Sequence, residues 1–178
     1  MNQNFLIIAV TPPYFFKGES ERINSILSED QACLIHIRKP GASEKDIEKL
    51  IQEISPQYHN RLKLHDHFEL LEKYNLGGIH LNSRNPERNL KAKSVSISIH
   101  SLDEIEGKEN FDYFFISPVF DSISKEGYKA AFDLDVLSKK IRGKKAIALG
   151  GVSPEKFSQL KSLGFIGAAL LGHFFPKY

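Results

Sequence analysis

Short apolar runs alternate with amphipathic polar segments along the whole chain. Each run is rich in Val, Ile, Leu or Phe and is bounded by polar residues or glycine, the pattern that predicts a buried strand. The runs that we interpret as strands are Phe5–Thr11, Cys33–Arg38, Leu62–His65, Gly78–Leu81, Val95–His100, Tyr113–Val119, Lys145–Leu149 and Ala168–Leu171.

Helical patterns separate most of these runs. Ser43–Ser55 carries apolar residues at helical spacing, with Ser43 placed as its N-cap. Further helices are predicted around residues 68–76, in a short turn behind Ser101, at Asp135–Ile141 and at Pro154–Leu163. Alternating strands and helices predict parallel pairing, and eight units favour one closed (β/α)8 TIM barrel over residues 1–178.

Two segments depart from a regular barrel. Ser83–Lys93 is polar, contains Pro86 and lacks apolar periodicity, so we expect a loop or a single turn in place of a full fourth helix. Only seven residues follow Leu171, so the eighth helix is expected to be truncated or missing. A partner subunit is the simplest cover for the flank left open, which predicts a homodimer.

Charge and composition argue against nucleic-acid binding and against a membrane-spanning protein. The formal net charge of the 178 residues is +2 with both signs interspersed, so no basic stripe suggests nucleic acid. The apolar run Gly164–Phe175 is broken by glycines and is too short to cross a membrane. We therefore expect a cytoplasmic protein without membrane or nucleic-acid partners. The single Cys33 excludes an internal disulfide, and its apolar neighbours predict a buried thiol.

The ends of the predicted strands are unusually polar, and barrel chemistry occurs at those ends. Alternation places His36 and Arg38 on one face of the second strand, directed into the barrel mouth. A charge there needs a partner, which is either a ligand anion or an internal carboxylate such as Asp66.

The third and fifth strands add more candidates. The third ends in His65-Asp66-His67, where Asp66 either binds a metal or caps the following helix. His65 and His67 share a face on a regular strand, which leaves a metal hydrolase as a remote alternative. Ser98 and His100 share a face of the fifth strand.

Glycine turns end the seventh and eighth strands. Gly150-Gly151 and Gly172 can present bare backbone N–H groups to a phosphate, or they are ordinary turn residues. The loop after the sixth strand contains Ser122, Ser124 and Lys125, a combination that can hold a phosphate or pyrophosphate.

In this order, these pieces resemble the thiamin phosphate synthase / TenI family. The resemblance covers nearly the whole chain and implies a (β/α)8 barrel of thiamin biosynthesis, usually a homodimer. It is carried by Ile35-His36-Ile37-Arg38, Leu64-His65-Asp66, Gly78-Ile79-His80-Leu81, Ser98-Ile99-His100-Ser101, Ser117-Pro118-Val119-Phe120 and Ala148-Leu149-Gly150-Gly151.

The resemblance also implies roles for single residues. In the synthase, which joins a pyrimidine methyl pyrophosphate to a thiazole phosphate with Mg²⁺, Arg38 matches the arginine that contacts the pyrophosphate. Asp66 matches a magnesium ligand, and Gly151 and Gly172 fall on the cup for the thiazole phosphate. Ser122, Ser124 and Lys125 fall where the family has Thr-x-Thr-Lys.

The chain departs from both branches of the family. The synthase usually has Gln at His36, Lys at Pro40, Asn at His65 and a second metal-binding Asp near Asn85, whereas the TenI branch has its catalytic histidine at Pro118.

Because the local sequence fits TenI better, the sequence predicts a metal-free thiazole tautomerase. Its base would be His36, His65 or His100, with Lys125 as a further catalytic candidate. A Mg²⁺-dependent synthase and a non-catalytic binder of thiazole or thiamin phosphate are the alternatives.

Overall fold

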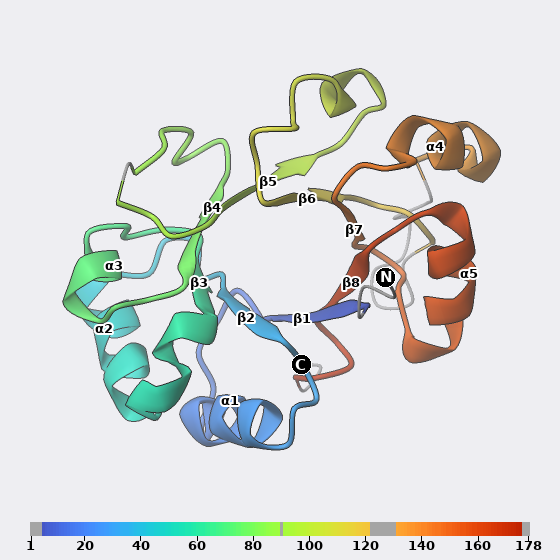
Figure 1. The fold of residues 1–178 in the computed structure, drawn as a ribbon. Helices are drawn as coiled ribbons and strands as arrows, with labels where there is room; N and C mark the ends of the chain where they lie inside the picture. Colours follow the sequence, from blue (N-terminus) through green and yellow to red (C-terminus); the bar gives the residue numbers. More distant parts are fainter. Residues whose placement is uncertain (1–4, 90, 122–130, 176–178) are drawn as a thin grey trace.

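The protein is described by a computed structural model that covers residues 5–89, 91–121 and 131–175. Eight parallel strands close into a barrel in sequence order, which confirms the predicted fold (Figure 1). The strands are β1 (Leu6–Val10), β2 (Leu34–Ile37), β3 (Leu62–Leu64), β4 (Gly78–Leu81), β5 (Val95–Ile99), β6 (Tyr113–Ile116), β7 (Ala146–Ala148) and β8 (Gly167–Leu170).

Helices cover two sides of this barrel. They are α1 (Glu19–Ser28), α2 (Glu44–Glu53), α3 (Leu70–Lys73), α4 (Leu134–Ile141) and α5 (Phe157–Leu163), with 3₁₀ turns η1 (Pro56–Arg61), η2 (Asp103–Ile105) and η3 (Pro154–Lys156). Ser43 caps α2 by accepting the N–H of Asp46 at 3.2 Å, as the sequence predicts. In Figure 1, α1 to α3 lie on one side and α4 and α5 on the other, while loops and η2 cover β5.

The two irregular segments are as expected within the described residues. Between β4 and β5 the described residues form no helix, only a tight turn in which Asn82 and Asn85 pair. Residues 171–175 after β8 form turns. Phe174 and Phe175 are buried, and the Phe174 carbonyl accepts a hydrogen bond from Arg22 Nε of α1 at 2.9 Å. The chain itself therefore covers part of the flank assigned to a partner, and the homodimer stays a prediction.

Strand alternation divides the core into two layers. Ile35 and Ile37 of β2 point outward into the large layer between strands and helices. A smaller layer fills the barrel and includes Ile8, Tyr113 and Phe115. Among these apolar side chains the barrel also encloses polar ones, because His36, His80 and Ser96 are almost fully buried. Barrel interiors are usually filled by branched apolar residues, so this polar content marks a specialised region.

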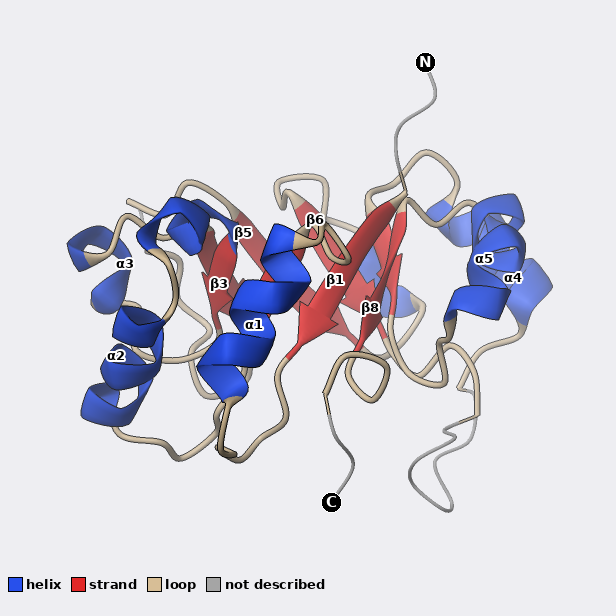
Figure 2. Ribbon diagram, turned by 90° about the horizontal axis from the view of Figure 1, so that it is seen from below, coloured by secondary structure: helices blue, strands red, loops and turns tan. Residues whose placement is uncertain are grey.

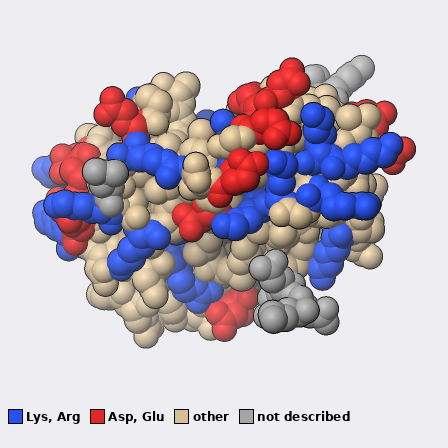
Figure 3. Space-filling model, turned by 45° about the horizontal axis from the view of Figure 1, so that its top comes forward, with Lys and Arg blue, Asp and Glu red and all other residues tan. Residues whose placement is uncertain are grey.

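The surface agrees with a protein of low net charge. Basic and acidic side chains lie intermixed over the face shown in Figure 3. In the described part of the chain, no helix is long and apolar enough to cross a membrane. Cys33 is exposed, so the prediction of a buried thiol is wrong. The residue precedes β2 rather than lying within it, and only its backbone joins the sheet, through its N–H to the Ile7 carbonyl.

A buried ion pair fixes two loops at one end of the barrel. Lys39 Nζ lies 2.5 Å from Glu19 Oε1, and the two side chains are 0% and 3% exposed. The same ammonium donates to the carbonyls of Pro12 at 2.9 Å and Tyr14 at 2.6 Å. Lys39 therefore joins the loop after β1 to the loop after β2, and its charge is used inside the protein.

Glu19→Ala should lower the free energy of unfolding by about 3–5 kcal/mol, because it leaves a buried ammonium without its carboxylate. Urea unfolding of the purified protein measures this. The double variant Lys39→Met/Glu19→Leu removes both charges and should recover much of the loss. A single variant as stable as the wild type would contradict the structural role of the pair.

Candidate functional site at the carboxyl ends of the strands

The candidate residues gather at one end of the barrel. In Figure 2 the arrow of β1 points to the lower end of the barrel, where all parallel strands have their carboxyl ends. Arg38, Asp66, His100 and Gly150 each follow a strand within two residues, so they lie at this mouth. The structure thereby brings together residues that are far apart in the sequence.

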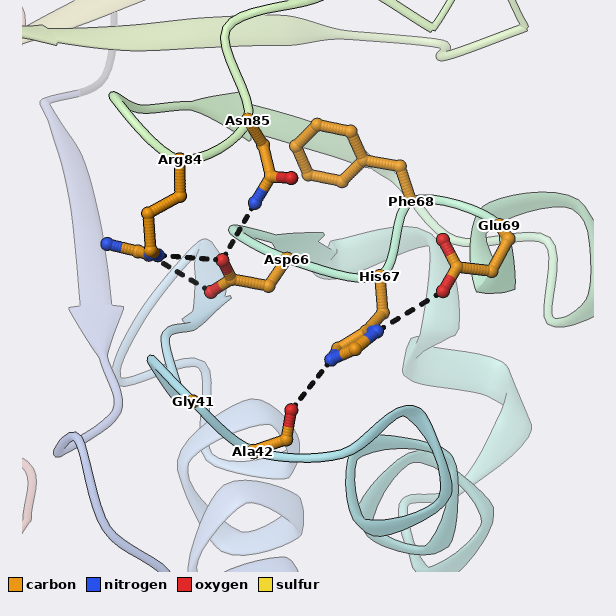
Figure 4. Close-up of a pocket in the computed structure, with 8 residues that line it drawn as sticks. All are labelled: Gly41, Ala42, Asp66, His67, Phe68, Glu69, Arg84 and Asn85. Atoms are coloured by element: carbon orange, nitrogen blue, oxygen red, sulfur yellow. Dashed lines mark hydrogen bonds and ion pairs between the residues drawn. The ribbon is translucent and has the colours of Figure 1, made fainter.

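Asp66 after β3 is held by two side chains from the loop after β4. Its two carboxylate oxygens accept hydrogen bonds from Nε and an Nη of Arg84, each at 3.1 Å. Asn85 Nδ2 adds a third hydrogen bond at 2.8 Å. Figure 4 shows Asp66 between these two partners, at the edge of a cavity of about 360 Å³. Asp66 therefore forms an ion pair and does not cap α3.

Arg38 lies close to this ion pair but outside it. Its side chain is half-buried, and among the described residues its guanidinium makes no hydrogen bond or ion pair. Burial and the neighbouring Arg84 charge lower the pKa of Arg38, and Asp66 raises it in part. The expected internal partner, Asp66, is thus taken by Arg84. A half-buried guanidinium without a carboxylate is suited to a ligand anion.

Three histidines form a cluster below the mouth, inside the barrel, in which His65 and His80 stack and His36 meets both rings edge-on. His36 Nδ1 lies 3.0 Å from His65 Nε2, and the rings of His65 and His80 stack with centroids 4.3 Å apart. The other nitrogen of His36 meets the Tyr113 hydroxyl at 2.7 Å. His80 is hydrogen-bonded by the hydroxyls of Ser96 and Ser98, both at 2.8 Å. Ser98 is therefore engaged by the histidine cluster.

These imidazoles are held neutral. Burial, helped by neighbouring positive charge, lowers the pKa of His36 and of His65 well below the usual value. Burial and the charge of Arg38 lower the pKa of His80 to about 3. The side chains of His36 and His65 are also nearly inaccessible, at 0% and 4% exposure. Both are poorly suited to take a proton from a ligand in the mouth.

His100 differs from the three buried histidines because it is exposed at the mouth. Its Nδ1 lies 3.1 Å from the Ser117 carbonyl oxygen, which can only accept. In the neutral ring Nδ1 therefore carries the proton and Nε2 has the lone pair, and among the described residues Nε2 makes no hydrogen bond. Of the histidines predicted as bases, His100 has the geometry that a base needs.

His67 does not join His65. A positive φ of 56° at His67 breaks the strand alternation, and its ring bonds to Ala42 and Glu69 instead. The expectation that His65 and His67 share a face is therefore wrong, and a hydrolytic metal site built on this pair loses its support.

The glycine turn after β7 has the form of an anion site. Gly150 and Gly151 have φ of 88° and 63°, and a Cβ on Gly151 would collide with the Asp121 carbonyl. Within the described residues, the N–H groups of Gly150, Gly151 and Val152 donate to no backbone oxygen. Lys156 adds positive charge, because its Nζ donates to the Gly151 carbonyl at 2.8 Å. Gly172 is exposed after β8, and Ser122, Ser124 and Lys125 lie outside the described residues.

The residues at Asp66 do not fit a Mg²⁺ ion. This cation requires hard oxygen ligands, usually one or two carboxylates with substrate phosphates. Both oxygens of Asp66 are taken by Arg84, and the neutral Asn85 turns its amide nitrogen to the same carboxylate. The buried nitrogens of His36, His65 and His80 lie within 4.8 Å of one another, but they suit softer metals than Mg²⁺.

Sequence reasoning missed two residues of the mouth and named Asn85 only as a departure from the family pattern. Arg84 follows β4 in the polar segment interpreted as a loop, and Lys156 lies in the turn that begins the last helix. The signal for Arg84 was its place beside Asn85, where the family resemblance suggests a metal-binding aspartate. His80, expected to be a core imidazole, is indeed buried.

The fold and mouth define a (β/α)8 barrel with two arginines after β2 and β4 and a glycine turn after β7 at its opening. A family model for thiamine monophosphate synthase matches residues 7–174. The crystal structure of thiamine phosphate pyrophosphorylase from Bacteroides thetaiotaomicron is 35% identical, with a TM-score of 0.83 and coverage of 98% of this chain and 86% of that chain.

Two curated relatives are named thiamine-phosphate synthase. The protein from Syntrophomonas wolfei is 23% identical over 186 residues, which cover 96% of this chain and 88% of that protein. The protein from Leuconostoc citreum is 26% identical over 141 residues, covering 74% of this chain and 66% of that protein. The chain belongs to the thiamine monophosphate synthase family, a family of thiamin-biosynthesis enzymes.

The buried histidines predict acid instability. Below pH 6.5 the unfolded chain protonates these residues while the folded protein keeps them neutral, so the unfolded state binds more protons and stability falls with pH. Each histidine adds up to about 1.4 kcal/mol per pH unit to this slope.

Urea unfolding between pH 7 and pH 5 measures how steeply the free energy of unfolding changes with pH. His80→Asn should reduce this slope by the contribution of one histidine. The exposed His173→Asn serves as the matched control. If the free energy of unfolding stays constant as the pH is lowered from 6.5 to 5, the folded protein protonates the cluster and the prediction is wrong.

Proposed function

We propose that this protein is a thiamine-phosphate synthase, which joins a pyrimidine methyl pyrophosphate to a thiazole phosphate. The observation that carries the proposal is that two groups suited to anions lie at separate places on one mouth. Arg38 and Arg84 lie after β2 and β4, and the open N–H groups of Gly150 and Gly151 lie after β7. Two phosphorylated substrates need two such sites, and the curated relatives carry this name.

We assign each substrate a side of the mouth from the charge and backbone geometry there. The pyrophosphate lies at Arg38, and the thiazole phosphate lies on the glycine turn beside Lys156. In the reaction, the thiazole nitrogen forms a bond to the methylene carbon as the carbon–oxygen bond breaks. The pyrophosphate leaves with the bonding electron pair, and nearby positive charge stabilises it.

A thiazole tautomerase is the second candidate, and His100 favours it. This exposed histidine has a free Nε2 at the mouth. The two buried candidates, His36 and His65, do not strengthen that reaction, since both are neutral and enclosed. A synthase needs no such base, which is why we place it first.

The purified protein should form thiamin phosphate from the two substrates, measured by its fluorescent oxidation product. His100→Ala should change this rate by less than about threefold, since no proton transfer at His100 is required. Formation of the aromatic thiazole from its tautomer without any thiamin phosphate, abolished in His100→Ala, would establish the tautomerase instead. Binding of thiazole phosphate without turnover in either assay would indicate a non-catalytic binder.

Gly151→Ala should raise KM for the thiazole phosphate about tenfold or more, because the added Cβ collides with the Asp121 carbonyl and opens the turn. KM for the pyrimidine substrate should change little. Gly143→Ala is the matched control, since Gly143 also has a positive φ of 75° but has open space around its Cβ position. Equal changes in the two KM values would contradict the assignment of this turn to the thiazole phosphate.

A further inference from the structure

The Arg84–Asp66 pair stands where the family resemblance suggests a metal. The guanidinium meets the two carboxylate oxygens through two hydrogen bonds of 3.1 Å, the bidentate pairing that Arg and carboxylate prefer. The Asp66 side chain is only 13% exposed, so its carboxylate needs a cation. Arg84 supplies that charge from within the chain.

The pair leaves Arg84 able to bind a second anion. Its side chain is 42% exposed, and N–H groups of the guanidinium remain unused by Asp66. Arg38 follows β2 and Arg84 follows β4, the two strands that flank β3 and Asp66, so both arginines lie at the same edge of the mouth. Among the described residues, the Arg38 guanidinium has no hydrogen bond or ion pair. Two positive charges and one negative charge leave an excess of one positive charge at this side of the mouth. An anion with several oxygens would relieve the repulsion between the two guanidiniums.

We propose that Arg84 replaces the magnesium ion in this protein, so that Arg38 and Arg84 together bind a pyrophosphate group without a divalent metal. This inference rests on the proposed function for its ligand, the pyrophosphate of the pyrimidine substrate. Asp66 acts as a positioning residue that orients Arg84 toward the mouth. Asn85 fixes the same carboxylate and leaves the site without the second aspartate that a metal would need.

The charge balance of the free protein argues against a metal in this position. A Mg²⁺ ion on Asp66 would lie beside two guanidiniums with a single carboxylate to balance all three cations, and neighbouring like charges repel. It would also have to displace Arg84 from both oxygens of Asp66. Removing Arg84 should therefore free the carboxylate and allow a metal to bind with the pyrophosphate.

Calorimetric titration of the full chain with inorganic pyrophosphate tests the proposal. The wild-type protein should bind pyrophosphate in EDTA, with an affinity that changes less than about threefold in millimolar Mg²⁺. Arg84→Ala should lower the affinity in EDTA about tenfold or more, and Mg²⁺ should restore part of it. Arg84→Ala/Asn85→Asp adds the missing carboxylate and should depend on Mg²⁺ more strongly.

Arg88→Ala is the matched control, because Arg88 lies in the same loop and contacts Asn110 and Phe111 instead of Asp66. Arg88→Ala removes the same charge as Arg84→Ala. Because Mg²⁺ also forms complexes with pyrophosphate in solution, the effect of Mg²⁺ on this control variant is the baseline for its effect on Arg84→Ala. Arg84→Gln tests the same point with a side chain that can still donate to Asp66, in case the alanine variant unfolds.

Wild-type binding that requires Mg²⁺, or an Arg84→Ala variant that behaves like Arg88→Ala, would overturn the inference. So would a wild-type protein that binds no pyrophosphate in either condition. The proposed function fails separately. Synthesis of thiamin phosphate that depends strictly on Mg²⁺ would support the proposed function and contradict the inference. Metal-free binding of pyrophosphate without synthesis would support the inference and contradict the proposed function.

Discussion

The site depends on which cation neutralises the Asp66 carboxylate, an arginine of the chain or a metal ion. The Arg84 guanidinium takes both of its oxygens, and Asn85 takes one of them again. Within the described part of the chain, Arg38 is consequently left without an internal partner, so its charge is available to a ligand. The same pairing removes the oxygen ligands that a Mg²⁺ ion would use.

The barrel interior beneath this pair obeys a related constraint. Three clustered imidazoles can lie under two guanidiniums only if they stay uncharged, and burial together with nearby positive charge keeps their pKa values low. Both nitrogens of His36, both nitrogens of His80 and Nε2 of His65 are hydrogen-bonded within the cluster, to Tyr113 or to serine hydroxyls. The cluster forms a polar floor for the site and gives the mouth a fixed shape, while His100 and the glycine turn remain in contact with solvent.

The fold could be read from the sequence because each strand is a short apolar run and the strand order follows the chain. The positions of Arg38 and of the glycine turn at the mouth could also be predicted, because both directly follow strands that the apolar runs identify. The helix α1 was not predicted. The pairing of Asp66 with Arg84 was not predicted either, because Arg84 lies in the irregular loop after β4, and the apolar pattern does not specify the path of that loop. Alternation also failed at His67, where a left-handed residue turns the chain.

The central claim is that the mouth binds pyrophosphate through arginines in place of a metal. A crystal structure of the protein with pyrophosphate and Mn²⁺, which scatters anomalously and can substitute for Mg²⁺, tests it most directly. The account predicts pyrophosphate density in contact with Arg38 and Arg84, with Asp66 still bonded to Arg84 and no anomalous peak beside it. An anomalous peak bonded to Asp66, with Arg84 displaced, would contradict the account.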